Sequence, residues 1–384
     1  MLKIKAYFNI IFIISILIIS SFLFVKCQLF NKNSKNQLVN LKSIKTVRGL
    51  SSTNCSVNQN GAVIIMYHRF DGKYSSTSVT RDLLKEHLDF FRGNGFNIVS
   101  LEKVVQAIQT GESLPPKTLA ITVDDAYRSV YEIAHPLFLK YQAPYTVFVN
   151  TKALDQNISD YMSWSQLRRL AQSNLTDLSA HSHTHAYMLR ELNSTQREKD
   201  IKTSVLRIYQ ETDHLPIYFA YPYGETNKKF INEVKNYRWN IEGQPFRFLA
   251  AFTTQSGPVG CSSSLFALPR FALNMNYGKV NDLFRSKMLS RHFPIKNFSP
   301  SDLAFCSSDK IQKFSLSSSH LDLNRLNCFS SNGQVFMKQK NSNQMDIILK
   351  QPFIKGLRQR INCTLPDGEG QFFWFGKEFS ILNC

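Results

Sequence analysis

The chain has 384 residues, of which 43% are hydrophobic and 12% aromatic. This is enough apolar material to bury a sizeable core and to build more than one domain. The net charge of +18 favours anionic partners, but the basic residues are spread along the chain without an arginine-rich run, zinc-finger spacing or base-stacking motif. We therefore expect no nucleic-acid partner.

The N-terminal segment has the character of an export signal. Lys3 and Lys5 precede an uncharged apolar stretch over residues 10–25. This stretch is slightly long for the core of a signal peptide and slightly short for a comfortable membrane span. We favour an uncleaved membrane anchor over residues 1–27, with a cleaved signal as the alternative. Residues 28–60 are rich in Asn, Ser and Lys, which is typical of a linker. The protein is thus expected on the periplasmic or cell-envelope side, anchored or secreted.

Apolar strands and amphipathic helices then alternate over residues 61–295. The predicted strands are "AVIIMYHRF", "TLAITVDD", "PYTVFVN", "TDLSAHSHTH", "IYFAYPYG", "RFLAAFTT" and "LFALPRFAL". Helical spacing is found in segments such as "TRDLLKEHLDFFRGNGF", "LEKVVQAIQTG", "SWSQLRRLAQ" and "TQREKDIKTSVLRIYQET". This alternation predicts an α/β fold with a parallel sheet, and the number of units predicts a closed or nearly closed barrel.

Reactive side chains gather where the predicted strands end, which is the rim where a barrel of this kind builds its pocket. Two adjacent carboxylates, Asp124 and Asp125, follow one strand, and two histidines spaced i, i+4, His181 and His185, follow another. An aspartate pair at a buried strand end costs desolvation and repulsion unless a cation or a catalytic task compensates. Two neutral nitrogens and one anionic oxygen supply the three protein ligands of a catalytic divalent metal site.

The order of motifs "TVDDAY", "HSHTH", "YPYG" and "LPRF" resembles the polysaccharide deacetylase family, the NodB-like carbohydrate esterases of family 4, and especially its poly-N-acetylglucosamine deacetylase branch. The resemblance covers most of residues 61–275. It implies a distorted (β/α) barrel in which Asp125, His181 and His185 hold zinc, with nickel, cobalt or iron as alternatives. It also implies that Asp124 is the general base and that the backbone N–H of Tyr223 helps to stabilise the oxyanion.

These roles suit the hydrolysis of an N-acetyl amide, which needs a metal to polarise its carbonyl and a base to take the proton of water. We therefore expect a metal-dependent N-deacetylase that acts on an envelope or extracellular polysaccharide containing N-acetylglucosamine. The polymer stays open among poly-N-acetylglucosamine, peptidoglycan and chitin-like chains. A catalytically weak or inactive glycan-binding protein that retains the barrel is the alternative.

Three departures from the family pattern bear on activity. Ala126 replaces the glycine that usually follows the aspartate pair, and Ala220 stands where an arginine usually orients the base. We expect Arg270 of "LPRF" to substitute for that arginine from the next strand. The usual Leu-x-His of the general acid is not found, and His292 in "LSRHFP" is the one late candidate, which we interpret as a surface histidine.

Three further residues are candidates for substrate binding. Tyr221 lies in the "YPYG" motif, Trp164 precedes a helix, and His68 ends the first barrel strand. Trp164 could stack on a sugar or pack in the core, and His68 could equally be a structural histidine. His183, between the two proposed ligands, is expected to point away from the metal.

The last region, residues 300–384, shows short strand-like pieces between Ser, Asn, Asp and Gly turns, which predicts a small β-sandwich. It holds Cys306, Cys328, Cys363 and Cys384, and in an exported protein these are expected to form two disulfides rather than a zinc site. Sequential pairing is the simplest of the three possibilities. The aromatic run "FFWFG" fits a carbohydrate-binding platform or, equally, a core strand of a domain that caps the barrel.

Overall fold

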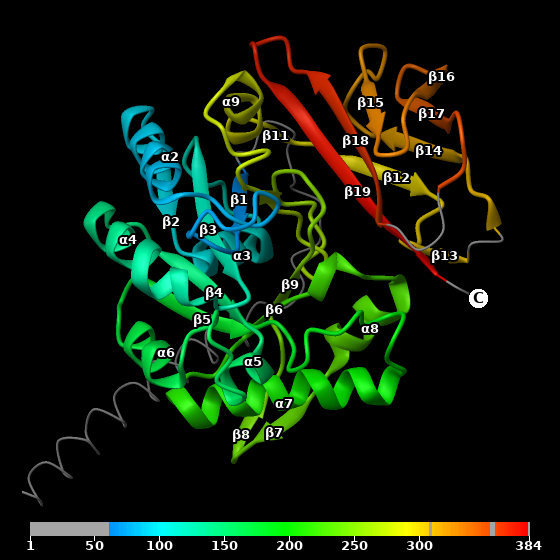
Figure 1. The fold of residues 1–384 in the computed structure, drawn as a ribbon. Helices are drawn as coiled ribbons and strands as arrows, with labels where there is room; N and C mark the ends of the chain where they lie inside the picture. The colour runs from blue at the N-terminus through cyan, green and yellow to red at the C-terminus, as the bar shows by residue number, and fades with distance from the viewer. Residues whose placement is uncertain (1–60, 307–308, 354–357, 383–384) are drawn as a thin grey trace, which may run out of the picture. The chain divides into compact units, whose positions relative to one another are not determined.

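The computed structural model describes residues 61–306, 309–353 and 358–382 (Figure 1). All of these residues belong to a single compact unit. The predicted anchor (1–27) and linker (28–60) lie outside the described residues. Within the described part of the chain, no helix combines the length and apolar character that a membrane span requires.

The centre of the N-terminal part is a parallel sheet with strand order β10-β1-β3-β4-β5-β6-β9, and β2 pairs with β3 beside this path. Every one of these pairings is parallel. The strands are β1 (Ala62–Tyr67), β2 (Asn97–Val99), β3 (Thr118–Asp124), β4 (Tyr145–Val149), β5 (Thr176–Ala180), β6 (Tyr218–Ala220), β9 (Ala250–Phe252) and β10 (Phe271–Ala272). The predicted (β/α) barrel, in its distorted form, is confirmed.

Helices connect successive strands and lie around the outside of the sheet (Figure 1). They are α2 (Arg81–Gly93), α3 (Leu101–Thr110), a π-helical turn (Val130–Ala134) that continues into α4 (His135–Tyr141), α5 (Thr151–Asp155), α6 (Trp164–Ala171), α7 (Ser194–Thr212), α8 (Lys228–Asn236) and α9 (Asp282–Met288). A 3₁₀ turn (Pro222–Gly224) follows β6, and a small hairpin of β7 (Trp239–Ile241) and β8 (Gln244–Phe246) precedes β9.

Local sequence explains where these elements sit. Strands β1, β3 and β4 are buried along their whole length and rich in Val and Ile, as central strands covered on both faces must be. The helices begin at residues that can accept a hydrogen bond from the first turn. Thr80 caps α2, and Asn193 forms a reciprocal capping box with Gln196 at the start of α7.

The segment from Leu268 to Ala272 closes the barrel between its two edge strands. On one side, Leu268 pairs in parallel with Phe252 of β9. On the other side, β10 pairs with β1 through Ile65 and Phe271. Arg270 therefore stands in the segment that joins the last barrel strand to the first.

The C-terminal part consists of two sheets, with strand orders β11-β19-β18-β15, where β13 also pairs with β19, and β12-β14-β17-β16. The strands are β11 (Arg291–His292), β12 (Ile295–Ser299), β13 (Ala304–Cys306), β14 (Lys313–Ser318), β15 (Asn327–Ser330), β16 (Val335–Asn341), β17 (Gln344–Leu349), β18 (Arg358–Pro366) and β19 (Phe372–Leu382). Phe314 of one sheet and Phe379 of the other pack with ring centroids 4.9 Å apart in a shared core. The predicted all-β region after the barrel is confirmed.

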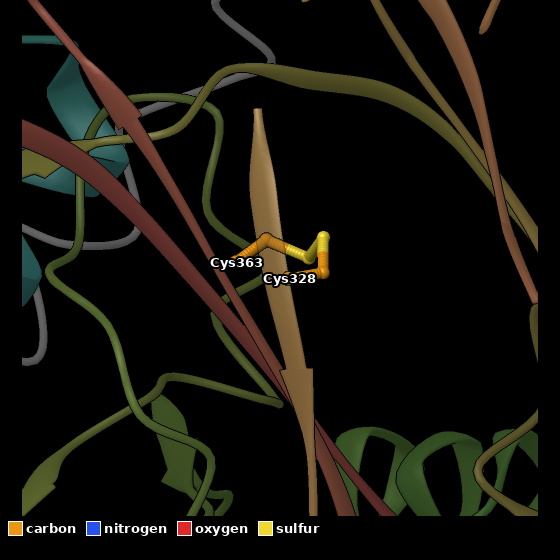
Figure 2. The surroundings of a disulfide bond; sticks show 2 residues. All are labelled: Cys328 and Cys363. Carbon is orange, nitrogen blue, oxygen red and sulfur yellow. A yellow bond between two sulfur atoms is a disulfide. The ribbon is translucent and has the colours of Figure 1, made fainter. Parts of the chain in front are cut away.

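One disulfide joins β15 to β18, between Cys328 and Cys363 (Figure 2). The two cysteines stand opposite each other in the antiparallel ladder. Cys261 and Cys306 are disulfide-bonded as well. The expectation of disulfides is therefore confirmed, but sequential pairing of Cys306 with Cys328 is wrong. Strand register decides the pairing, and register was not visible in the spacing of the cysteines.

The aromatic run in β19 is a core strand and not a sugar platform. Phe373, Phe375 and Phe379 point into the core between the C-terminal sheets. Trp374, on the opposite face of the strand, packs edge-on against Phe271 of the barrel with ring centroids 5.3 Å apart. Because these rings are buried or half-buried in protein contacts, the carbohydrate-binding interpretation of "FFWFG" is not supported.

Candidate metal centre and active site

The two adjacent aspartates separate at the end of β3. Asp124 is the last residue of the strand, whereas Asp125 and Ala126 adopt positive φ angles of 76° and 59°. The turn sends the two carboxylates in different directions, and both are buried. Positive φ is costly for a residue with a side chain. This explains why glycine suits the position of Ala126, which is accommodated here in a left-handed conformation.

The histidine motif lies in a tight loop directly after β5. The backbone N–H of His181 continues the sheet by donating to the Val149 carbonyl (3.0 Å), and Ser182 and His185 adopt positive φ. Asp200 of α7 accepts hydrogen bonds from the backbone N–H groups of His183 and Thr184, which holds the loop in shape. The ring of His183 turns to the Thr151 hydroxyl (2.8 Å), as expected for the histidine between two ligands.

Asp125, His181 and His185 bring one possible metal-binding atom each into a cluster in which all three atoms lie within 4.8 Å of one another. The Nε2 atom of His185 is 3.1 Å from Oδ1 of Asp125 and 3.2 Å from Nε2 of His181. Nδ1 of His181 donates to the Ala220 carbonyl (2.8 Å), so its Nε2 can present a lone pair to the cluster. Two imidazole nitrogens and a carboxylate oxygen are a suitable donor set for zinc or a similar divalent ion.

The electrostatics of the cluster agree with that use. Burial lowers the pKa of His181 to about 4, so its ring is neutral at physiological pH. Burial opposes ionisation of Asp125, but the nearby His185 outweighs it and lowers the pKa of the carboxyl. Burial likewise opposes protonation of His185, while the Asp125 charge raises the pKa of its ring. Asp125 is therefore the anionic member of the cluster.

Asp124 is held by an arginine from the closing segment. The Arg270 guanidinium donates to both carboxylate oxygens, at 2.7 and 2.8 Å, and to the Thr122 hydroxyl. Both residues are almost fully buried. Burial raises the pKa of Asp124, but the Arg270 charge overcomes this effect and the pKa is lowered below its usual value. Arg270 thus pairs with Asp124, and its substitution for the arginine replaced by Ala220 stays a prediction.

The "YPYG" turn approaches the cluster from the end of β6. Tyr223 has a positive φ of 57°, and its ring lies against His185 with centroids 4.6 Å apart. Tyr187 stacks on Tyr223 with centroids 3.9 Å apart and planes within 9°. A second stacked pair, Tyr127 and Tyr161, is near enough to Asp125 for the carboxylate, after burial, to raise the pKa of both phenols. Half-buried aromatic faces therefore flank the three clustered residues.

The three expected substrate-binding residues lie in different surroundings. Tyr221 is fully buried and its hydroxyl donates to the Phe266 carbonyl, so a substrate cannot reach it and that prediction is wrong. Trp164 is half-buried. Its indole N–H donates to the Asp155 carboxylate, and the Arg207 guanidinium lies over its ring. These contacts favour packing over sugar stacking. His68 is half-buried, and its charge contributes to the lowered pKa of both Asp124 and Asp125. His68 therefore remains a candidate for a role beside the two aspartates.

His292 is not an exposed surface histidine. Its ring nitrogens form hydrogen bonds with the Ser262 hydroxyl (2.6 Å) and the Pro258 carbonyl (3.3 Å), and not with the Asp-His-His cluster. Burial lowers the pKa of its ring to about 4. These contacts join β11, in which His292 is the last residue, to the loop after β9, which is a structural role.

One residue of the site was missed in the sequence. Asn150, directly after β4, donates to Oδ1 of Asp125 at 3.3 Å. Its position at the carboxyl end of a parallel strand is the same signal that marked the aspartates and histidines. Asn150 orients the carboxylate that forms the anionic part of the cluster.

The part of the chain that carries the Asp-His-His cluster is similar to known polysaccharide deacetylases. Residues 111–240 match the model of the family described as polysaccharide deacetylase, which confirms the resemblance carried by the motifs. The chain is 27% identical over 261 residues to the poly-beta-1,6-N-acetyl-D-glucosamine N-deacetylase of Escherichia coli strain K12, a match that covers 56% of this chain and 37% of the relative. The chain thus spans well under half the length of that relative.

A shorter relative is covered more fully. The enzyme of the same name from Staphylococcus epidermidis is 24% identical over 253 residues, covering 59% of this chain and 82% of that protein. Among solved structures, IcaB from Ammonifex degensii superposes with a TM-score of 0.52 at 18% identity, covering 60% of this chain and 98% of that one. The Streptococcus pyogenes deacetylase PplD, solved with acetate, gives a TM-score of 0.50 at 21% identity, covering 57% and 95%. These likenesses support the barrel fold.

Proposed function

We propose that the protein is a metal-dependent N-deacetylase that removes acetyl groups from an N-acetylglucosamine-containing polysaccharide. The observation that supports the proposal most directly is that the two adjacent aspartates have different partners. Asp125 faces His181 and His185 within ion-binding distance, whereas Asp124 is turned to Arg270. One carboxylate is arranged to bind a cation, and its neighbour is kept ionised beside it.

The residues would divide the chemistry as follows. A divalent ion held by Asp125, His181 and His185 would polarise the amide carbonyl and lower the pKa of the attacking water. Asp124 would accept the proton of that water, and Arg270 would keep the carboxylate ionised and correctly oriented. The backbone N–H of Tyr223, on a turn with fixed positive φ, would donate to the oxygen that gains negative charge. Zinc is the ion we expect first.

The departing amine needs a proton, and we propose that His68 supplies it. No Leu-x-His motif provides the usual donor, and His292 is occupied by Ser262 and Pro258. His68 is the histidine outside the proposed ligand set whose charge acts on both Asp124 and Asp125. It directly follows β1, which pairs with β3, the strand that ends at Asp124. An imidazole is well suited to donate a proton near neutral pH.

The proposed substrate is a polymer and not a free sugar. The stacked pairs Tyr127–Tyr161 and Tyr187–Tyr223 offer aromatic faces beside the cluster, and such faces suit the apolar side of a sugar ring. The names of the two relatives make β-1,6-linked poly-N-acetylglucosamine the first polymer to test. An exported or envelope location, with attachment through the N-terminal segment, would place the enzyme beside such a polymer.

The test is acetyl loss from defined oligomers. The zinc-loaded protein is incubated separately with β-1,6-linked N-acetylglucosamine oligomers, chitin oligomers and peptidoglycan fragments. The masses of the products are then measured by mass spectrometry. We expect a loss of one acetyl group per event from at least one substrate, abolished by chelation and restored by adding metal. Matched reactions with Asp124→Asn control for acetyl loss that does not depend on the site.

The non-catalytic alternative predicts the opposite pattern. A glycan-binding protein would retain oligomers without releasing acetate, and Asp124→Asn would leave binding unchanged. The bond from Arg270 to Asp124 weakens this alternative, because the buried pair preserves an oriented base despite the change at Ala220. Binding without acetate release under metal-loaded conditions would reject the enzyme proposal.

A further inference from the structure

Strand β19 of the C-terminal region has one face directed at the barrel. Alternate residues of a strand point to the same side, and Trp374, Gly376 and Glu378 are such a set. Trp374 packs on Phe271, the residue after Arg270. At Gly376 the strand runs so close to the barrel loop that a Cβ atom would lie 2.4 Å from the Ser256 carbonyl oxygen.

Glu378 reaches the catalytic turn itself. It is 4% exposed, and it accepts a hydrogen bond from the Thr254 hydroxyl at 2.9 Å. A Cβ atom on Gly224 would lie 2.1 Å from that hydroxyl oxygen and 2.9 Å from Oε1 of Glu378. Gly224 also has a positive φ of 72°. The last residue of the "YPYG" turn is therefore enclosed by a barrel side chain and a C-terminal carboxylate.

A second contact reaches Tyr223, the preceding residue. The guanidinium of Arg358, at the start of β18, donates to the Tyr223 carbonyl at 2.9 Å and lies 6.0 Å from the centroid of its ring. Arg358 also stands 3.8 Å from Glu378, and Arg360 bonds the other carboxylate oxygen of Glu378 at 2.6 Å. Arg358 thus bonds the Tyr223 carbonyl, and Glu378 borders Gly224 together with Thr254. The two contacts join residues that are 135 and 154 positions apart in the chain (358 − 223 and 378 − 224).

We propose that the C-terminal β region is a positioning unit of the active site, in which Arg358 and Glu378 fix the shape of the Pro222–Gly224 turn. The inference rests on the proposed function, because a fixed turn matters for catalysis only if the Tyr223 N–H donates to the reacting carbonyl oxygen. Neither residue touches the three clustered ligands. Both act through the turn, where a displacement of about 1 Å can cost on the order of a hundredfold in rate.

The kinetic test compares two variants with a matched control. Arg358→Ala removes the donor to Tyr223, and Glu378→Gln removes the charge beside Gly224. Glu369→Gln makes the same chemical change as the latter at a side chain that is 79% exposed, in the β18–β19 turn. We expect kcat to fall about 10- to 100-fold in the two variants, with KM and zinc affinity unchanged and Glu369→Gln like wild type. Arg358→Lys should recover part of the rate.

A second measurement does not require activity. The amides of Gly224 and Glu225 donate within the turn, to the Tyr221 and Pro222 carbonyls. Hydrogen exchange of the peptide covering residues 218–228 should be faster in Arg358→Ala and Glu378→Gln than in wild type or Glu369→Gln. Unchanged exchange, or unchanged kcat in an active wild type, overturns the positioning role. A wild type that is inactive while the turn loosens as expected rejects the proposed function and keeps this inference.

Discussion

Arg270 and Asp124 form a two-pronged ion pair that is almost completely removed from water. A buried pair of this kind is expensive to break, because removing one member leaves an uncompensated charge. We expect Arg270→Met to lower the free energy of unfolding by roughly 3–5 kcal/mol. The double variant Arg270→Met/Asp124→Asn should recover part of that loss. Urea unfolding of wild type, Arg270→Met, Asp124→Asn and the double variant measures the coupling, and equal stability of Arg270→Met and the double variant would contradict it.

Asp124 and Asp125 should fail in different ways when each is changed to Asn. Asp125→Asn should lose metal affinity, since the cluster would have no anionic ligand. Asp124→Asn should keep the metal and lose the proton acceptor, at a cost of about 10²- to 10⁴-fold in kcat. Metal content by mass spectrometry and acetate release are measured on the same samples. Equal metal loss in both variants would mean that both carboxylates are ligands.

His68 can be tested by varying the leaving group. If it protonates the departing amine, His68→Gln should reduce amide hydrolysis by about 10²- to 10⁴-fold. An activated ester such as 4-nitrophenyl acetate releases a group that needs no proton, so its hydrolysis should be nearly spared. The ratio of the two rates, measured with equal metal loading, is the readout. A similar drop with both substrates would assign His68 to binding or structure.

His87 should make the fold sensitive to mild acid. The ring is fully buried, bonded to the Tyr67 hydroxyl and the Gly278 carbonyl, and stacked near Phe284. Burial lowers its pKa to about 4, below the value of about 6.5 in an unfolded chain. Between these values only the unfolded state binds the proton, so stability is complete above pH 6.5 and falls towards pH 4, by roughly 3 kcal/mol at most.

The control for this prediction is His87→Gln, which can retain hydrogen bonding without the titration. Its stability relative to wild type should improve as the pH falls through that window. Denaturant unfolding at several pH values gives the two curves. Parallel curves would show that His87 does not carry the acid sensitivity.

The Cys328–Cys363 disulfide should stabilise the C-terminal region. It links residues 35 positions apart and encloses the β16–β17 hairpin. Closing a loop of this length in the unfolded chain typically contributes about 2–4 kcal/mol. We expect the double variant Cys328→Ala/Cys363→Ala to unfold at lower urea concentration, and thiol titration of the denatured wild type should find neither cysteine reduced. Wild-type stability in the double variant would contradict the expectation.

The sequence predicted those parts of the site that follow a local rule. Asp124, Asp125, His181 and His185 each follow a recognisable buried strand, and the ends of parallel strands converge, so their meeting could be expected. Tyr221 was assigned to the substrate because it shares a motif with Tyr223. Only the backbone shows that β6 directs its ring into the core. Side chains alternate between the two faces along an extended segment, and the motif alone does not show which of its residues face the core.

The contacts from the C-terminal region could not be predicted. Arg358 and Glu378 belong to strands whose sequence shows alternation but not what each face meets. The disulfide pairing failed for the same reason, since it depends on the register between β15 and β18. Register and the approach of one sheet to another layer arise from long-range packing. Short sequence patterns carry little information about either.

The closing segment has a practical consequence for anyone who shortens this protein. The family match ends at residue 240, before β9 and before the stretch from Leu268 to Ala272 that joins β9 to β1. A fragment cut at the end of the match would keep Asp124 and the three proposed metal ligands, Asp125, His181 and His185. It would nevertheless leave a sheet edge unpaired and remove Arg270. Such a fragment would contain the "TVDDAY", "HSHTH" and "YPYG" motifs and still lack the arginine that keeps Asp124 ionised and oriented.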